Sequence, residues 1–374
     1  MTKGTLNIGA KVAIKKPQLD ILISSLQESG YQTVGPRVRD NAITYAPIDT
    51  LDDLPLGYIS EQERGFYRLI PGKHERYFDV TPGADSWKKF LFPPRSRLFE
   101  ASRENGYWKE DLIQEELPKY AFIGVRPCEL SAIRVQDRVF IRDDYVDPIY
   151  KSRRENVLII AVSCLHPSST CFCTSMGTGP KATSGFDLSF TELEDAFLVE
   201  VGSKAGSTAL QTLEWERAIA YRLQLVEAEF LKAERSIQRH IENTNLLPDI
   251  LLENLDHPLW EEVGKRCLSC TNCTQVCPTC FCWDVEDLTN LSGDTTWRER
   301  VWDSCFNPSY SEQAGGNTRP TTKSRYRQWL THKMGSWVKQ FGELGCVGCG
   351  RCITWCPAKI DITDEIIKFQ EAAE

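Results

Sequence analysis

The chain has 374 residues, of which 41% are hydrophobic, and a formal net charge of −8 at pH 7. This length and apolar content are enough for two domains that each bury a core. The negative charge argues against nucleic acid as the main partner, because nucleic-acid-binding surfaces are basic. The longest apolar stretch, Val157–Val162, is far shorter than the ~20 residues of a membrane-spanning helix.

The 15 cysteines are too few in a chain of this length for a disulfide scaffold. Most of them stand in metal-binding spacings, which favours a reducing compartment. Residues 1–10 have no apolar segment typical of a secretory signal. We therefore expect a cytoplasmic protein with no membrane span.

The amino-terminal part shows mixed helix and strand patterns. Residues 17–30 predict a short helix that ends at a glycine, and the run Ala42–Ala46 predicts a strand. The charged, proline-free segment from Leu210 to about Glu242 predicts a long helix that joins two domains.

The middle of the chain predicts a parallel βαβ unit. Tyr120–Val125 and Val157–Val162 are typical of buried strands, and residues 129–139 between them have helical spacing. Cys128 and Cys164 each follow the carboxyl end of one of these strands. Because the carboxyl ends of parallel strands meet at one edge of a sheet, we expect both thiols in the same crevice.

Two cysteine runs near the carboxyl end share the spacing C-x-x-C-x-x-C-x-x-x-C-P, which is that of bacterial two-cluster ferredoxins. The first run consists of Cys267, Cys270, Cys273 and Cys277, and the second run of Cys346, Cys349, Cys352 and Cys356. In this pattern three cysteines bind one iron–sulfur cube and the fourth, before the proline, binds the other cube.

This crossed pattern predicts two [4Fe-4S] clusters. The ligands expected for the first cluster are Cys267, Cys270, Cys273 and Cys356, and those for the second are Cys346, Cys349, Cys352 and Cys277. Two zinc sites are the alternative, but zinc motifs usually place a longer spacer between C-x-x-C pairs.

These patterns together predict the fold class and the domains. Residues 1–207 are expected to form an α+β or α/β domain with the parallel βαβ unit, and residues 208–245 a linking helix. Residues 246–374 are expected to form a bacterial-type two-cluster ferredoxin-like domain that is mostly helical and carries a long insert at residues 283–344.

Seven cysteines lie outside the two runs. Four of them, Cys128, Cys164, Cys171 and Cys173, are candidates for a third four-thiolate metal site, with buried apolar thiols as the alternative. The other three are Cys280, Cys282 and Cys305, for which packing beside a cluster and metal ligation are both open. A basic stretch from Arg319 to Lys333 is a solvated face, an offset to cluster charge or a surface that docks an acidic partner.

Four strings in this sequence resemble one protein family. They are Gly124-Val-Arg-Pro-Cys128-Glu-Leu, Cys171-Phe-Cys-Thr-Ser-Met-Gly-Thr-Gly-Pro180, Cys277-Pro-Thr-Cys-Phe-Cys282 and Cys346-Val-Gly-Cys-Gly-Arg-Cys352. The family is the β (iron–sulfur) subunit of cytoplasmic NAD(P)-linked [NiFe] hydrogenases, also called sulfhydrogenases. The electron-transfer subunit of anaerobic sulfite reductase is similar to it.

The resemblance implies an electron-transfer subunit of a heteromeric complex. Its partners would be a flavin subunit that binds NAD(P)H and the small and large subunits of a [NiFe] hydrogenase. The chain has no G-x-G-x-x-G fingerprint and no convincing catalytic constellation, so we expect no catalytic residues of its own. The competing interpretations are an enzyme that reduces a substrate at an unusual cluster, the electron-transfer subunit of an anaerobic sulfite reductase, and a structural zinc protein.

Overall fold

The computed structural model describes residues 6–111 and 117–373. The first five residues of the segment in which we expect no secretory signal lie outside the described part. Among the described helices, none combines the length and the hydropathy needed to cross a membrane.

The amino-terminal half is built on an eight-stranded sheet with both parallel and antiparallel pairs. The strands in spatial order are β14 (Glu216–Arg217), β1 (Lys11–Lys15), β13 (Ala196–Val201), β12 (Leu188–Glu192), β11 (Val157–Val162), β8 (Lys119–Val125), β2 (Tyr31–Arg39) and β3 (Ala42–Pro47). The pairs β2–β8, β8–β11 and β11–β12 are parallel, and the outer pairs are antiparallel.

The predicted βαβ unit is confirmed. Strand β8 pairs in parallel with β11, and the helix between them is α3 (Pro127–Phe140). Successive residues of β8 are buried on opposite faces of the sheet: Ile123 packs in one core with α1 (Gln18–Glu28), and Phe122 packs in another with α3. Burial on both faces explains why these strands form continuous apolar runs.

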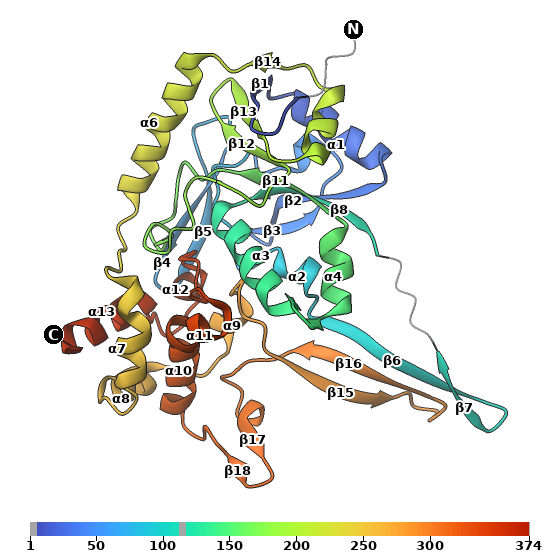
Figure 1. Cartoon of the computed structure of the whole chain (residues 1–374), viewed down its shortest axis with the longest axis vertical. Helices are drawn as coiled ribbons and strands as arrows, with labels where there is room; N and C mark the ends of the chain where they lie inside the picture. Colours follow the sequence, from blue (N-terminus) through green and yellow to red (C-terminus); the bar gives the residue numbers. More distant parts are fainter. Residues whose placement is uncertain (1–5, 112–116, 374) are drawn as a thin grey trace.

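The helix predicted for residues 17–30 and the strand predicted at Ala42 are confirmed as α1 and β3. The long joining helix is shorter than predicted. Helix α6 extends only over Ala220–Ser236, because the chain before it pairs with the sheet edge as β14 and first makes a 3-10 turn at Leu210–Thr212. Figure 1 shows α6 running from the sheet towards the carboxyl-terminal helices.

The carboxyl-terminal part contains seven α-helices among the described residues. They are α7 (Leu247–Glu253), α8 (Leu259–Arg266), α9 (Asn272–Gln275), α10 (Thr322–Thr331), α11 (Trp337–Phe341), α12 (Arg351–Thr354) and α13 (Ile362–Ala373). Their core includes Trp260, Trp329, Leu330 and Phe369. The prediction that this part is mostly helical is wrong, because the insert at 283–344 also forms strands.

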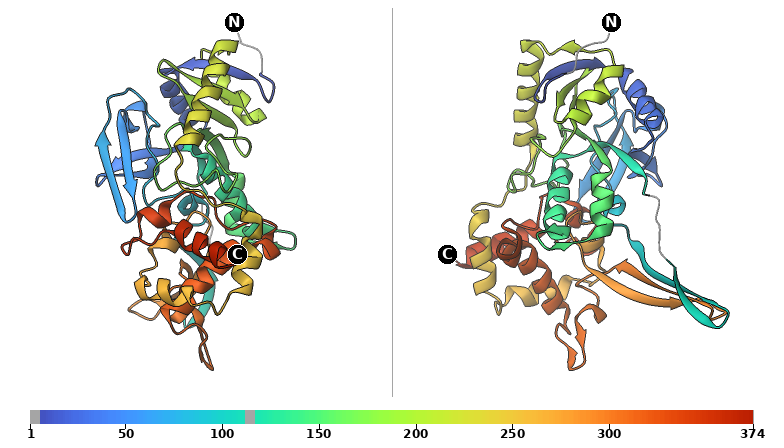
Figure 2. Two further views of the ribbon diagram at one scale, coloured as in Figure 1. Left: turned by 90° about the vertical axis from the view of Figure 1, so that its left-hand side faces the viewer. Right: turned by 45° about the vertical axis from the view of Figure 1, so that its right-hand side comes forward.

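The insert contributes half of a second sheet. Its hairpin, β15 (Trp283–Thr289) and β16 (Thr295–Trp302), pairs with β6 (Arg95–Glu104), which pairs in turn with β7 (Tyr107–Asp111). The insert forms strands because β6 offers β16 a free edge whose hydrogen bonds only a strand can complete. This four-stranded sheet extends away from the body of the protein (Figure 2).

The remaining elements are short. The helices are α2 (Lys88–Leu91), α4 (Pro148–Glu155) and α5 (Lys204–Ala209), and the hairpins are β4–β5 (Tyr58–Glu63 and Phe66–Pro71), β9–β10 (Ile141–Arg142 and Tyr145–Val146) and β17–β18 (Glu312–Gln313 and Gly316–Asn317). The division into residues 1–207, 208–245 and 246–374 stays a prediction.

Candidate iron–sulfur centres

The two cysteine runs fold into the same local structure. In the first run the backbone N–H of Ser269 donates a hydrogen bond to Cys267 Sγ, and in the second run that of Gly348 donates to Cys346 Sγ, each at 3.5 Å. The residues on either side of the second cysteine of each run have positive φ, and a short helix follows, α9 or α12. The repeated spacing therefore makes one loop twice, and each copy presents three thiols.

The two copies differ in their surroundings. In the first run the positive-φ positions are Ser269 and Thr271, near the surface. In the second run they are Gly348 and Gly350, which are buried against residues 170–173. A Cβ on Gly350 would lie 2.4 Å from the carbonyl oxygen of Thr170. The second run thus needs glycine both for its backbone conformation and for its contact with the amino-terminal half.

We expect Gly350→Ala to destabilise the contact between the second run and residues 170–173. Its φ of +74° costs an L-residue about 1–2 kcal/mol, and the overlap with Thr170 adds to this cost. The measurement is the midpoint of urea unfolding under anaerobic conditions. The matched control is Gly315→Ala, because a Cβ there has nothing within 4 Å and no strained φ. Equal shifts for the two variants would contradict the expectation.

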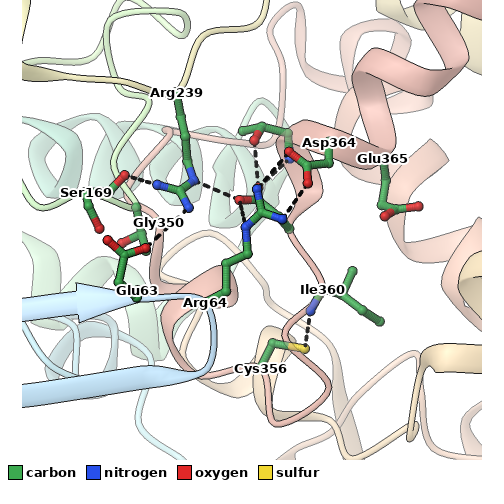
Figure 3. A network of polar contacts seen from close by, with 12 residues as sticks. Glu63, Arg64, Ser169, Arg239, Gly350, Cys356, Ile360, Asp364 and Glu365 are labelled. Carbon is green, nitrogen blue, oxygen red and sulfur yellow. Dashed lines mark hydrogen bonds and ion pairs between the residues drawn. The ribbon is translucent and has the colours of Figure 1, made fainter.

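The structure brings together the four cysteines predicted for the first cluster. Their side chains line one largely apolar pocket, together with Cys352, Phe306, Tyr326 and Trp329. Burial, together with the nearby Cys356 and Cys270 sulfurs, raises the pKa of Cys267. The backbone N–H of Ile360 donates to Cys356 Sγ at 3.4 Å (Figure 3). Cys356 thus joins the first run across the sequence, as the crossed pattern requires.

Cys277 crosses in the opposite direction. Burial raises the pKa of Cys346 to about 12, and the charges of Cys349 and Cys277 act in the same direction. Burial also raises the pKa of Cys352, with contributions from Cys346, Cys349 and Cys277. Cys277 is therefore close to the thiols of the second run. The ligand sets themselves stay a prediction that this placement supports.

Lys333 is a buried cation in contact with the second set of thiols. Its Nζ donates hydrogen bonds to Cys277 Sγ at 3.3 Å, to Thr279 Oγ1 at 2.9 Å and to the carbonyl oxygen of Gly345 at 2.9 Å. Burial works against its charge, but the nearby Cys277 and Cys280 outweigh burial and raise the pKa of Lys333 well above its usual value. A cation that donates to a ligand sulfur stabilises the more negative, reduced state of a cluster.

A widened turn of helix directs Lys333 inward. Residues His332–Ser336 form a π-helical segment between α10 and α11, and Lys333 is only 3% exposed. For this residue the interpretation as a solvated face is wrong, and the alternative that it offsets cluster charge is favoured. Arg325, four residues into α10, is also buried. The spacing of the basic stretch carries no sign of which members turn inward.

The candidates for a third site also come together. Cys128, Cys164, Cys171 and Cys173 line one pocket, and Cys349 of the second run lines the same pocket. Burial raises the pKa of all four thiols above the usual value, that of Cys171 to about 11. Four thiols that are protonated without a metal can become ligands only when a metal displaces their protons.

The last three cysteines make hydrogen bonds to other thiols. A hydrogen bond from Cys280 lowers the pKa of Cys277, and one from Cys305 lowers the pKa of Cys282 to about 6. The hydrogen bond to Cys277 favours packing beside the second set of thiols as the role of Cys280. Within the part of the chain that the structure describes, no three His, Cys, Asp or Glu side chains form a group that could hold a single metal ion.

Polar side chains hold the loop with Cys171 against the carboxyl-terminal end of the second run. Arg239 donates hydrogen bonds to the carbonyl oxygen of Ser169 and, from its Nε at 2.7 Å, to the carboxylate of Asp361 (Figure 3). The Nε of Arg64 lies 3.0 Å from the same carboxylate. The side chain of Asp361 is fully buried. Two guanidinium groups thus neutralise one buried carboxylate at the joint.

Sequence reasoning missed a buried ion pair between the two halves. Glu129 follows Cys128 in α3, and its Oε1 lies 2.6 Å from Nη2 of Arg351, between Cys349 and Cys352. Tyr45 donates a hydrogen bond to the other oxygen of the same carboxylate. No local signal could have found this pair, because its members are 222 residues apart.

Comparison with known proteins agrees with these features. A family model described as a 4Fe-4S dicluster domain matches residues 266–360. Sulfhydrogenase 2 subunit beta of Pyrococcus furiosus is 31% identical over 350 residues, which are 91% of this chain and 93% of the relative. No solved structure matches the chain. The prediction of iron–sulfur clusters in a ferredoxin-type domain is confirmed.

Proposed function

Because the chain belongs to the family of sulfhydrogenase β subunits, an iron–sulfur family of electron-transfer subunits, we propose that it relays single electrons within a hydrogenase complex. The proposed donor or acceptor on one side is a subunit that binds flavin and NAD(P)H. On the other side are the small and large subunits of a [NiFe] hydrogenase. The electrons pass through two [4Fe-4S] clusters, which are held by the two crossed sets of cysteines.

The observation that carries this proposal is the pairing of the two runs. One loop structure occurs twice, and the last cysteine of each run lies near the thiols of the other run, which supports the crossed ligand sets. Such crossing holds two clusters close together, since each run contributes to both sites. A bound cube takes up or gives up one electron with little change in shape.

The residues around the thiols suit the two sites to electron transfer. Apolar side chains, among them Phe306 and Trp329, line the pocket of the first set and limit access of water. Backbone N–H groups and Lys333 donate to the sulfurs of the two sets. These are the contacts by which a protein sets a cluster's reduction potential.

The proposal predicts which reductants the isolated chain accepts. Reconstituted anaerobically with ferrous iron, ferric iron and sulfide, the chain is expected to be reduced by dithionite but not by NADPH, because the sequence has no dinucleotide fingerprint. Bleaching of the visible absorption of the clusters measures the reduction. Rapid bleaching by NADPH without a flavin subunit would contradict a relay role.

Purification of the complex from its natural source separates the remaining alternatives. Chains that contain nickel and flavin, recovered together with this one, support the hydrogenase complex. A chain with sirohaem in their place would show that the partner is a sulfite reductase.

A further inference from the structure

We propose that Cys128, Cys164, Cys171 and Cys173 bind a third iron–sulfur cube, placed directly beside the second cluster. Neither proposed cluster uses these four cysteines. The metal site itself is independent of the proposed function, whereas its part in an electron relay rests on that function.

Three separate segments bring the four thiols together. Strand β8 ends at Val125 and leads into α3, whose first turn carries Cys128. Strand β11 ends at Val162, and Cys164 follows it. The parallel pairing of these strands places both cysteines at one edge of the sheet.

The loop after Cys164 folds back over this edge. The backbone N–H of Cys164 donates to the carbonyl oxygen of Pro180 at 2.9 Å, which closes a loop that contains Cys171 and Cys173. Ser168 Oγ lies 3.3 Å from Cys171 Sγ. All four thiols then line one pocket instead of scattering through the core.

Two buried arginines give the pocket the charge that thiolates require. Arg126 and Arg351 line it and are 5% and 2% exposed. Arg126 is held by hydrogen bonds to the carbonyl oxygens of Phe78, Val80 and Ser163. Buried charges need partners, and a cube with four thiolates is anionic. Arg351 is already paired with Glu129, whereas none of the residues that line the pocket offers a carboxylate to Arg126, so protonated thiols alone would leave Arg126 without an anion there.

The second run forms one wall of this pocket. Cys349 lines it together with the four thiols. The backbone N–H of Phe172 donates to the carbonyl oxygen of Gly348 at 2.9 Å, and Thr178 Oγ1 donates to that of Val347 at 2.6 Å. These bonds fix the loop of the third site to the second run.

This placement gives the three proposed sites a linear order. The second site lies between the third site, at the joint of the two halves, and the first site, whose Cys270 is exposed at the surface. Exchange of one electron between the second and third sites oxidises one as it reduces the other, and leaves every iron–thiolate bond intact. Loading of the third site with two ferrous ions, two ferric ions and four sulfides forms four iron–thiolate bonds to protein and releases four thiol protons to solvent.

The test counts iron and acid-labile sulfide in the full chain, reconstituted anaerobically with ferrous iron, ferric iron and sulfide. The chain is expected to hold about twelve irons, and Cys171→Ala about eight, at four irons per cube. If Cys171→Ala retains the other eight irons, the variant has folded. If Cys171→Ala does not fold, Cys164→Ala is measured in its place. The matched control is Cys305→Ala, a buried thiol outside the pocket, which is expected to retain about twelve irons.

Electron paramagnetic resonance of the dithionite-reduced protein tests the position of the site. Cys171→Ala is expected to remove only the part of the magnetic broadening that the third cluster adds to the second cluster's signal, and to leave the coupling between the first and second clusters in place. About eight irons in the parent chain, zinc in place of the third cube, or equal iron loss in Cys171→Ala and Cys305→Ala would each overturn the proposal. Reduction by NADPH would overturn the relay function but not this iron count.

Discussion

Cys277→Ala is expected to remove the second cluster and to leave the first cluster in place. The residue belongs to the first run by sequence, but it lies close to Cys346 and Cys352 and accepts a hydrogen bond from Lys333. Without its thiolate, the second cluster has three ligands and Lys333 loses the sulfur that accepts its hydrogen bond. The chain should therefore lose about four irons, which iron analysis and paramagnetic resonance of the reduced protein can measure.

Cys280→Ala is the control for this substitution. Cys280 is half-buried beside Cys277 and donates a hydrogen bond to it, but it is not one of the ligands predicted for the two clusters. It is expected to keep both clusters and to shift the potential of the second. Loss of the first cluster alone in Cys277→Ala would show that each run holds its own cube.

Glu129→Gln is expected to destabilise the protein strongly. The substitution leaves the guanidinium of Arg351 buried, 3% exposed at its side chain, without a carboxylate partner. Removal of one partner of a buried ion pair costs about 3–5 kcal/mol. Because the pair joins α3 to the second run, we also expect the two halves to separate at lower urea concentration. Anaerobic unfolding followed by tryptophan fluorescence measures both effects.

An exposed ion pair offers the matched control. Arg222 and Asp195 lie 2.6 Å apart at the surface, and the side chain of Asp195 is 67% exposed. Asp195→Asn is expected to cost at most about 1 kcal/mol, because water screens such pairs. If Glu129→Gln costs no more than this, the buried pair does not hold the two halves together.

The structure also shows why some local predictions are wrong. Helical spacing alone predicts the joining helix from Leu210, yet residues 216–217 pair with β1 at the sheet edge. The insert is expected in a mostly helical domain, yet β16 completes the edge of β6, a strand nearly 200 residues earlier in the chain. In both cases a distant strand offers hydrogen bonds that a local pattern does not encode.

The sequence by itself determined the chemistry of the protein. The spacing of the two runs defines the ferredoxin-type sites, because loops of that length can curl three thiols around one cube wherever they lie. The sequence also indicated the βαβ unit, and with it the meeting of Cys128 and Cys164, because apolar runs of this length and order favour parallel strands.

Only the tertiary structure decided what surrounds these thiols. It placed Cys349 in the wall of the pocket with Cys128, Cys164, Cys171 and Cys173, and it turned Lys333 inward. It also joined Glu129 to Arg351 across 222 residues. The physical reason is that charge compensation in a buried site depends on which groups share a low-dielectric space, and that depends on the packing of whole elements, which no local spacing specifies.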